Sequence, residues 1–353
     1  MTYGSAGVAV FFVVSGFCIH LSYQRNRNQS WRDFFHRRFF RIYPPYLAAL
    51  ALFFFVWPWG MLSLEGGTRQ VQLLTHLFSV HNFHSLTLFG INGSFWSVAV
   101  EVQLYIIYPV LLVLMSKYGW RKGMVCILSI ELTIRASATV YALYFGESMP
   151  RFIINSPFAY WFSWAIGAYL AECYLNEQPN FLSRIRFDVM AAIALITPIF
   201  AFTGAFKFLA FSMLTGIAID RLIREKWTAP SQGFAGLIWR HLSFLGVVSY
   251  SFYLFHQPIA RMTRPLLAEL FPQVDFHVLV IYAICTMWYP VILLLSYASY
   301  RAIELRGVAV GKFVWNRFRR PAEVVEAAMV AVPLDTTTGR SDDQKHGDSG
   351  EPR

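Results

Sequence analysis

The sequence predicts an all-α polytopic membrane protein, and three observations lead to that fold class. Hydrophobic residues make up 56% of the 353-residue chain and charged residues only 14%, against roughly 25% in a typical soluble domain. The apolar residues gather in runs of roughly 17–25, the length that crosses a bilayer as a helix. The basic residues behind the formal net charge of +10 lie in short segments between these runs. This placement favours membrane orientation by the positive-inside rule over nucleic-acid binding.

About nine runs are long enough to be transmembrane helices. They cover approximately residues 4–23, 42–62, 96–115, 124–145, 158–175, 187–203, 205–222, 242–260 and 276–299. Residues 1–305 are therefore expected to form one transmembrane domain, and 306–353 a basic segment followed by a polar, disordered tail. Basic excess alternates with each crossing, which places five segments in the cytoplasm: 24–41, 116–123, 176–186, 220–241 and the C-terminal tail. An outside start with an odd number of spans suggests that one preceding span is absent from this chain.

The first span carries a small pair, Ser15 and Gly16. Small residues let a second helix, or the chain of a ligand, approach closely. Both interpretations stay open from the sequence. His20, nearer the cytoplasmic end, is either a buried neutral histidine or a catalytic one.

An arginine cluster precedes the second span. Arg38 and Arg41 are three residues apart, so they share a helix face with Arg37 beside them. A guanidinium cluster at the cytoplasmic membrane face suits a phosphate-bearing ligand. The alternative is a topology signal that contacts anionic lipid. Pro44-Pro45 is expected to break the start of this helix.

The third span begins at Trp96 and carries one carboxylate, Glu101. A charged side chain inside a membrane helix costs ~2.5–3.5 kcal/mol on insertion scales, so it marks a functional site by default. Ser97 and Tyr105 lie four residues to either side and share the helix face of Glu101. The alternative is a structural carboxylate that pairs with a cation such as Arg135.

Other polar groups lie near the predicted outer side. Tyr253 and His256 share a face near the outer end of the eighth span, where a histidine suits an acceptor-side role or an interfacial aromatic belt. Three outer-loop histidines have a spacing that could bind a metal but lack a fourth ligand: His76, His81 and His84. Four cysteines lie within apolar runs, so we expect small hydrophobic residues and no metal or disulfide: Cys18, Cys126, Cys173 and Cys285.

Five segments together resemble the acyltransferase-3 family of integral-membrane O-acyltransferases. They occur in the family's order and cover most of the predicted domain: residues 7–17, 37–46, 96–109, 249–259 and 299–304. The resemblance implies a multi-pass bacterial inner-membrane enzyme with a cytoplasmic C-terminus. It also implies transfer of an acyl group, commonly acetyl, from cytoplasmic acyl-CoA to a hydroxyl of a glycan or similar acceptor.

The resemblance also implies roles for individual residues. The acyl-CoA would be bound by Arg37, Arg38, Arg41, Ser15 and Gly16. Glu101 would act as the base or orient a histidine that does, with His256 as the second catalytic candidate. The substrate cavity would be lined by Trp96, Ser97, Tyr105 and Tyr253. The family's first helix, which carries a basic residue and a histidine about ten positions later, would precede Gly4 and give ten spans. Its absence indicates either a start placed too late or a truncated chain.

Two other function classes stay open from the sequence. A transporter or flippase could use Glu101 and Arg135 in its pathway, although inverted-repeat hydropathy is not evident. A truncated member of the same family could also be an inactive membrane scaffold.

Overall fold

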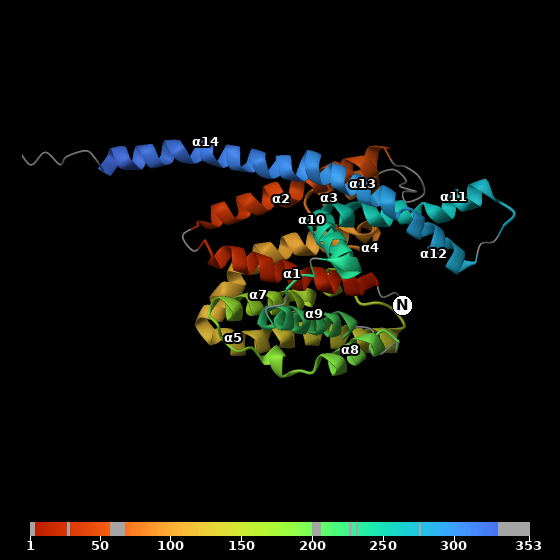
Figure 1. Cartoon of the computed structure of the whole chain (residues 1–353), viewed down its shortest axis with the longest axis horizontal. Coiled ribbons are helices and arrows are strands. Elements are labelled where there is room, and N and C mark those ends of the chain that lie inside the picture. The colour runs from red at the N-terminus through yellow and green to blue at the C-terminus, as the bar shows by residue number, and fades with distance from the viewer. Residues whose placement is uncertain are drawn as a thin grey trace, which may run out of the picture.

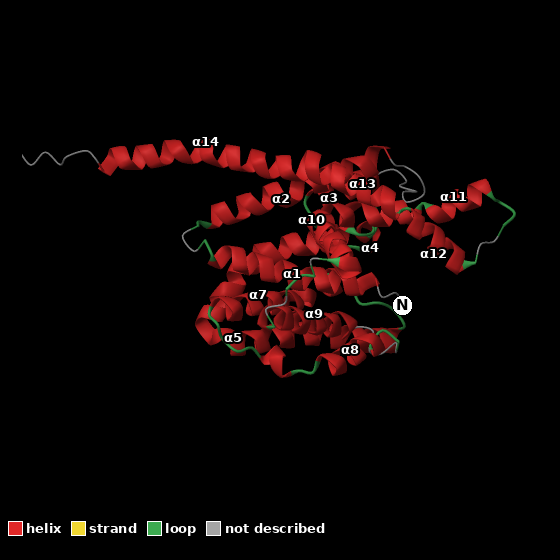
Figure 2. Cartoon of the chain, in the orientation of Figure 1, coloured by secondary structure: helices red, strands yellow, loops and turns green. Residues whose placement is uncertain are grey.

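A computed structural model of the chain describes residues 4–26, 29–56, 68–199, 206–225, 228–230, 232–274 and 277–330. Over these ranges the protein consists of helices joined by loops, without a β-strand (Figure 2). The predicted all-α class is therefore confirmed. The predicted tail covers 306–353; its first part is helical, within α14 (Leu305–Val330), and the part from residue 331 onward lies outside the described residues.

Fourteen α-helices are present in the described ranges. Their bounds are α1 Gly4–Gln24, α2 Trp31–Ala51, α3 Thr68–Leu77, α4 Ser85–Leu88, α5 Phe95–Phe145, α6 Arg151–Ile154, α7 Trp161–Leu175, α8 Phe187–Ile196, α9 Lys207–Arg224, α10 Gly233–Arg261, α11 Thr263–Leu270, α12 Val278–Met287, α13 Tyr289–Ser299 and α14 Leu305–Val330. Short 3₁₀ turns are η2 His81–Phe83, η3 Pro157–Tyr160 and η4 Phe181–Arg184, and π-helical turns are η1 Leu52–Val56 and η6 Tyr300–Glu304.

Three helices in the described part are long and apolar enough to cross a membrane. They are Ala6–Gln24, Phe95–Phe145 and Val280–Arg317. The protein is thus a helical membrane protein, but its helices do not establish nine spans. Several predicted spans correspond to short helices, such as the ten-residue α8. The count of nine is therefore not confirmed, and hydropathy does not show where helices begin and end inside an apolar run, as at the turn at Trp288 between α12 and α13.

Helix α5 covers two predicted spans and is interrupted between them. Gly119 has φ 75° and ψ 158°, which is a non-helical conformation that suits glycine. A Cβ on Gly123 would lie 2.5 Å from the Met115 sulfur, whereas residues eight apart in a straight helix are separated by about 12 Å. The two arms therefore fold back on each other at the predicted 116–123 turn.

Helix α2 begins earlier than predicted and is not broken at its prolines. Ser30 caps it, because the Ser30 hydroxyl accepts from the Asp33 amide and the Asp33 carboxylate accepts from the Ser30 amide. Pro44 lacks an N–H and leaves the Phe40 carbonyl without that helical partner. A Cβ on Gly307 of α14 would lie 2.9 Å from this carbonyl oxygen and from the Pro44 ring. The close approach of α14 therefore covers the turn where we had expected a break.

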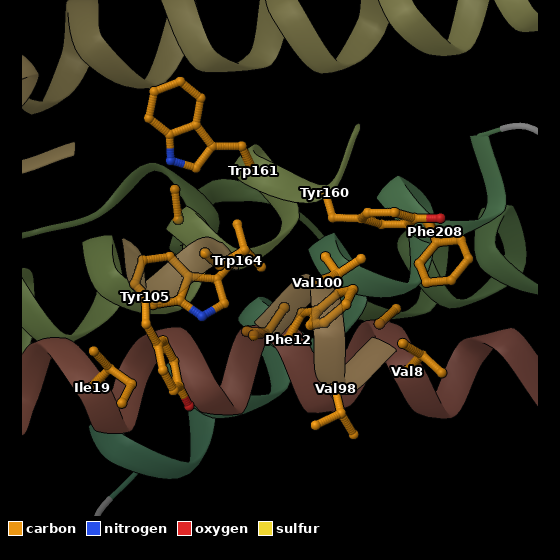
Figure 3. Packing of buried hydrophobic residues seen from close by; sticks show 14 of the residues in the cluster. Val8, Phe12, Ile19, Val98, Val100, Tyr105, Tyr160, Trp161, Trp164 and Phe208 are labelled. Carbon is orange, nitrogen blue, oxygen red and sulfur yellow. The ribbon is translucent and has the colours of Figure 1, made fainter. Parts of the chain in front are cut away.

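The core lies where α1 crosses between two groups of helices. Figure 1 shows α7, α8 and α9 on one side of α1, and α2, α10, α13 and α14 on the other. Two glycines let α1 and α7 touch, because a Cβ on Gly16 would overlap the Trp164 carbonyl and one on Gly167 the Val13 carbonyl. Figure 3 shows Phe12 of α1 packed among aromatic side chains of the neighbouring helices. This packing fixes the face of α1 that carries Ser15.

Candidate active site

Glu101 lies in the centre of the protein, on the first arm of α5. Its side chain is 4% exposed. The Ser15 hydroxyl of α1 donates to Glu101 Oε1 at 2.8 Å, and the Tyr105 hydroxyl, one turn along α5, donates to the same oxygen. Trp164 of α7 donates from Nε1 to Ser15 Oγ at 3.3 Å. Three helices thus orient one carboxylate oxygen, and Oε2 has no hydrogen bond to any described residue.

Glu101 lines a cavity of about 480 Å³, here called the glutamate cavity. Its walls come from α1, α2, α5 and α10, and its polar lining includes Ser15, Tyr105, Tyr250 and Tyr253. Along α1 the lining extends from Gly7 to Ile19, which is about 18 Å of helix. The cavity therefore reaches from near the predicted outer end of α1 to the arginine cluster of α2.

A second, larger cavity adjoins it and is here called the basic cavity. It has a volume of about 790 Å³ and lies between α2, η6, α14 and part of α10. Its cationic lining consists of Arg37, Arg38, Arg41 and Lys312, with His36 beside them. Arg38, Arg41 and Gly246 line both cavities. The two predicted same-face arginines thus lie at the junction.

The junction arginines are available to an anion. None of Arg37, Arg38 and Arg41 forms an ion pair with a described residue, in contrast to Arg135 and Arg224. Arg38 Nε is buried without a hydrogen-bond partner among the described residues, and its guanidinium carbon lies 5.6 Å from the centre of the Phe34 ring. Burial lowers the pKa of Arg38, although an arginine remains charged in proteins. An anion at the junction would supply the missing partner.

The other predicted site residues are divided between this cavity and its surroundings. The Tyr253 hydroxyl lines the glutamate cavity and lies 2.5 Å from Ser97 Oγ, which ties α10 to α5. Trp96 packs instead on Tyr160 and Phe208. Gly16 faces α7, so its position is one of helix packing.

His256 lies one turn beyond Tyr253 and is not among the residues that line the glutamate cavity. Its Nδ1 donates to the Tyr253 carbonyl oxygen at 2.7 Å. The histidine and Glu101 are therefore joined only indirectly, through α10 and the Tyr253 ring.

The alternative in which Arg135 neutralises Glu101 is wrong. Arg135 binds Glu131, with 2.7 Å between Nη2 and Oε1, and also donates to the Ala159 carbonyl. Glu131 further accepts from the Ser163 amide and hydroxyl. This buried group joins the second arm of α5 to α7 and accounts for the helix spacing of Glu131 and Arg135 that the sequence displays. His20 is likewise buried and bound, to Tyr108 at 2.9 Å and to Glu172 at 2.8 Å.

Several lining residues were not predicted from the sequence. Lys312 and Trp315 belong to a segment expected to be tail, and Cys18 was assigned to packing. For Lys312 and Trp315, one sequence signal could have indicated a role in a site. It is the spacing of a basic residue three positions before a tryptophan near the membrane boundary. Trp164 carried no signal, because its role depends on the packing of α7 against α1.

Comparison with known proteins identifies the family. A family model described as an acyltransferase domain matches residues 2–295. The chain belongs to the acyltransferase-3 family. Membership places it in a class of enzymes that transfer acyl groups, which confirms the resemblance inferred from the five segments. No solved structure matches the chain.

Three relatives illustrate the range of acyltransferase-3 proteins that the chain is similar to. YrhL of Bacillus subtilis, whose name provisionally gives it as a peptidoglycan O-acetyltransferase, is 28% identical over 289 residues, 74% of this chain and 45% of that protein. The peptidoglycan O-acetyltransferase OatA of Listeria monocytogenes is 25% identical over 300 residues, 75% of this chain and 46% of its own. The acyltransferase MdmB of Streptomyces mycarofaciens is 26% identical over 279 residues, 74% of this chain and 69% of its own. The chain thus spans less than half of the first two relatives.

Proposed function

We propose that this chain is an inner-membrane O-acyltransferase that moves an acyl group, acetyl in the first instance, from cytoplasmic acyl-CoA to a glycan hydroxyl. The observation that carries the proposal is the junction of the two cavities at Arg38 and Arg41. One cavity is basic, and the other leads to a buried carboxylate. An acyl-CoA has the matching division into an anionic nucleotide end and a narrow arm that ends in the thioester.

The proposed position of acyl-CoA follows from the charges of its phosphates and of the arginine side chains. Its phosphates lie against Arg38 and Arg41, with Arg37 at the mouth of the basic cavity, because guanidinium groups bind phosphate oxygens by charge-assisted hydrogen bonds. The arm enters the glutamate cavity past Cys18 and brings the thioester toward Ser15 and Glu101, which line that cavity. The basic cavity is lined by the 24–41 segment and the C-terminal helix, which the positive-inside rule assigns to the cytoplasm.

Glu101 supplies the proton chemistry. Its Oε2, which has no hydrogen bond to a described residue, accepts the proton of the acceptor hydroxyl as the oxygen attacks the thioester carbonyl. The new ester C–O bond forms, the C–S bond breaks, and the proton passes from Glu101 to the departing thiolate to give free CoA. The hydrogen bonds of Ser15 and Tyr105 to Oε1 hold the carboxylate in place during both transfers.

The acceptor approaches from the other end of the glutamate cavity. That end is lined by Gly7, Phe11 and Tyr253, and His256 lies behind Tyr253. His256 is the second catalytic candidate, and its contribution would pass through the position of the Tyr253 ring. Peptidoglycan is the first acceptor to test, because two relatives are named for it.

A transfer assay tests this function. Membranes that contain the chain would receive acetyl-labelled acetyl-CoA and peptidoglycan fragments, and labelled ester would be measured. The parent is expected to transfer label, and Glu101→Gln to lose at least about 100-fold in rate, because general-base catalysis contributes 10²–10⁴-fold. The matched control is Glu147→Gln, which changes an exposed carboxylate outside both cavities.

Two results would contradict the proposal. Full transfer by Glu101→Gln would remove the proposed base. Movement of unmodified substrate across the membrane, without ester formation, would favour the transporter class.

A further inference from the structure

The basic cavity has a wall that the chemistry at Glu101 does not require. It is formed by α14, whose lining residues are Leu305, Val308, Gly311, Lys312, Trp315 and Asn316. These residues lie beyond the stretch that matches the acyltransferase family, which ends at residue 295. The first part of α14 lies alongside α2, as Figure 1 shows. The basic cavity therefore has one wall that comes from outside the part of the chain matched by the family model.

The wall is fixed in place beside the arginine cluster. A Cβ on Gly311 would lie 2.6 Å from Phe40 Cβ, and one on Gly307 would lie 2.9 Å from the Phe40 carbonyl oxygen. Two glycines four residues apart thus form one face of α14 that seats directly on α2. This contact holds α14 against α2, so that Lys312 and Trp315 line the same cavity as Arg38 and Arg41.

Two side chains of this wall, an indole and an ammonium group, are of the kinds that bind the base and the phosphate of a nucleotide. The Trp315 ring is half-buried and lies 5.0 Å from the ring of His36, centroid to centroid, at an interplanar angle of 50°. An indole face is a stacking platform for a base. Lys312, one turn before Trp315, carries an exposed ammonium that forms no ion pair with a described residue, and a lysine ammonium binds phosphate as a point charge.

The acidic groups of the cavity do not offset this cationic wall. Asp33 Oδ2 is engaged by the Ser30 amide and hydroxyl at 2.8 Å each. Glu304 Oε2 accepts from the Ser251 hydroxyl at 3.3 Å. The cavity is thus lined by two carboxylates, both of which accept hydrogen bonds from serines, and by four cationic side chains, so its lining keeps a net positive charge.

We propose that α14 forms the subsite for the nucleotide end of the donor, with Trp315 stacked on the adenine and Lys312 bound to the ribose 3′-phosphate. This inference rests on the proposed function and makes it more specific. It makes α14 the element that distinguishes CoA from acyl carriers with the same pantetheine arm but no 3′-phosphate or no adenosine.

The test compares three ligands on the full chain in detergent by isothermal titration: CoA, dephospho-CoA and 4′-phosphopantetheine. The parent is expected to bind CoA at least about tenfold more tightly than dephospho-CoA. Lys312→Ala should bind these two alike, and Lys312→Arg should restore the preference because it keeps the charge. Trp315→Ala should weaken both nucleotide ligands by about tenfold and leave 4′-phosphopantetheine binding unchanged, which also reports an intact fold. Lys117→Ala, an exposed lysine outside the cavity, is the matched control.

The outcomes separate the two proposals. If the parent binds CoA and both α14 variants keep its preferences, the subsite is overturned and the donor assignment stands. If the parent binds no CoA, the proposed function fails and the subsite fails with it.

Discussion

Ser15 and Glu101 are joined by a hydrogen bond of 2.8 Å, although 86 residues separate them in the chain. Ser15 lies on α1 beside Gly16, and the glycine holds α1 against α7 while the serine faces the carboxylate. The sequence left open whether the Ser15-Gly16 pair serves helix packing or the functional site, and in the structure each residue has one of these roles. Helix packing belongs to Gly16, and the functional contact to Ser15.

Replacing Ser15 tests the positioning of Glu101. Ser15→Ala should lower kcat about 10- to 150-fold with little change in the KM for acetyl-CoA, because a charge-assisted hydrogen bond of about 1.5–3 kcal/mol is lost while the carboxylate remains. Steady-state transfer kinetics measure both constants. The same loss is expected for Tyr105→Phe, which removes the other donor to Oε1. Unchanged kcat in both variants would show that Glu101 needs no positioning.

The junction arginines should dominate donor binding. Arg38→Ala and Arg41→Ala are each expected to weaken CoA binding about tenfold or more, because each removes a guanidinium from the point that the two cavities share. Arg37→Ala should weaken it less, since Arg37 lines only the basic cavity. Arg32→Ala, an exposed arginine on the same helix, is the control for charge alone. Equal losses in all four variants would reduce the cluster to a general electrostatic effect.

The contact between α1 and α7 should tolerate no extra methyl group. Gly167→Ala places a Cβ onto the Val13 carbonyl, so helix separation must increase. A destabilisation of about 1–3 kcal/mol or more is expected from such overpacking. Gly7→Ala is the matched control, because no atom lies within 4 Å of its added Cβ. Thermal unfolding in detergent compares them, and equal melting temperatures would contradict this packing.

Two stacked histidines should make the segment 68–88 sensitive to acid. The rings of His76 and His81 are 3.8 Å apart and fully buried, and burial lowers the pKa of His76 from 6.5 to about 4 and that of His81 well below its usual value. Between about pH 4 and 6.5, His76 is therefore protonated in the unfolded chain but neutral in the folded one, so the unfolded chain binds more protons. Stability is therefore full above pH 6.5 and is lost as the pH falls toward 4, by about 3 kcal/mol for His76.

Melting temperatures between pH 7.5 and 5 measure this loss. His76→Phe should flatten the profile, whereas His84→Gln, outside the stacked pair, should leave it steep. A flat profile for the unmodified chain would contradict the assignment of buried neutral histidines.

The sequence predicted the polar centre of the protein better than its helix boundaries. Charged and small residues are rare in the apolar runs, so each one stands out in the sequence as a candidate for a functional site. This is how Glu101, Ser15, Arg38 and Arg41 could be singled out. The contact of Tyr105 with Glu101 followed from their spacing of four residues. These local relationships survive folding because they depend on one helix at a time.

Relationships between helices could not be predicted in the same way. The continuous course of α2 through Pro44, for example, depends on the neighbouring Gly307 of α14. The α14 wall belongs to the basic segment that is predicted to begin the C-terminal tail, and its place in the cavity appears only from its contact with Phe40. Such contacts join residues far apart in the chain, and hydropathy does not report them.

Protection of Cys18 by acetyl-CoA tests the central claim that the donor passes the arginine junction into the glutamate cavity. Cys18 lines that cavity beside Arg38 and Arg41, and Cys126 is an exposed thiol elsewhere. Two single-cysteine proteins would be alkylated with a small maleimide, one retaining Cys18 (C126S, C173S and C285S) and one retaining Cys126 (C18S, C173S and C285S). Saturating acetyl-CoA should slow alkylation of Cys18 about tenfold and leave Cys126 unchanged. Equal alkylation of Cys18 with and without acetyl-CoA would contradict the donor path.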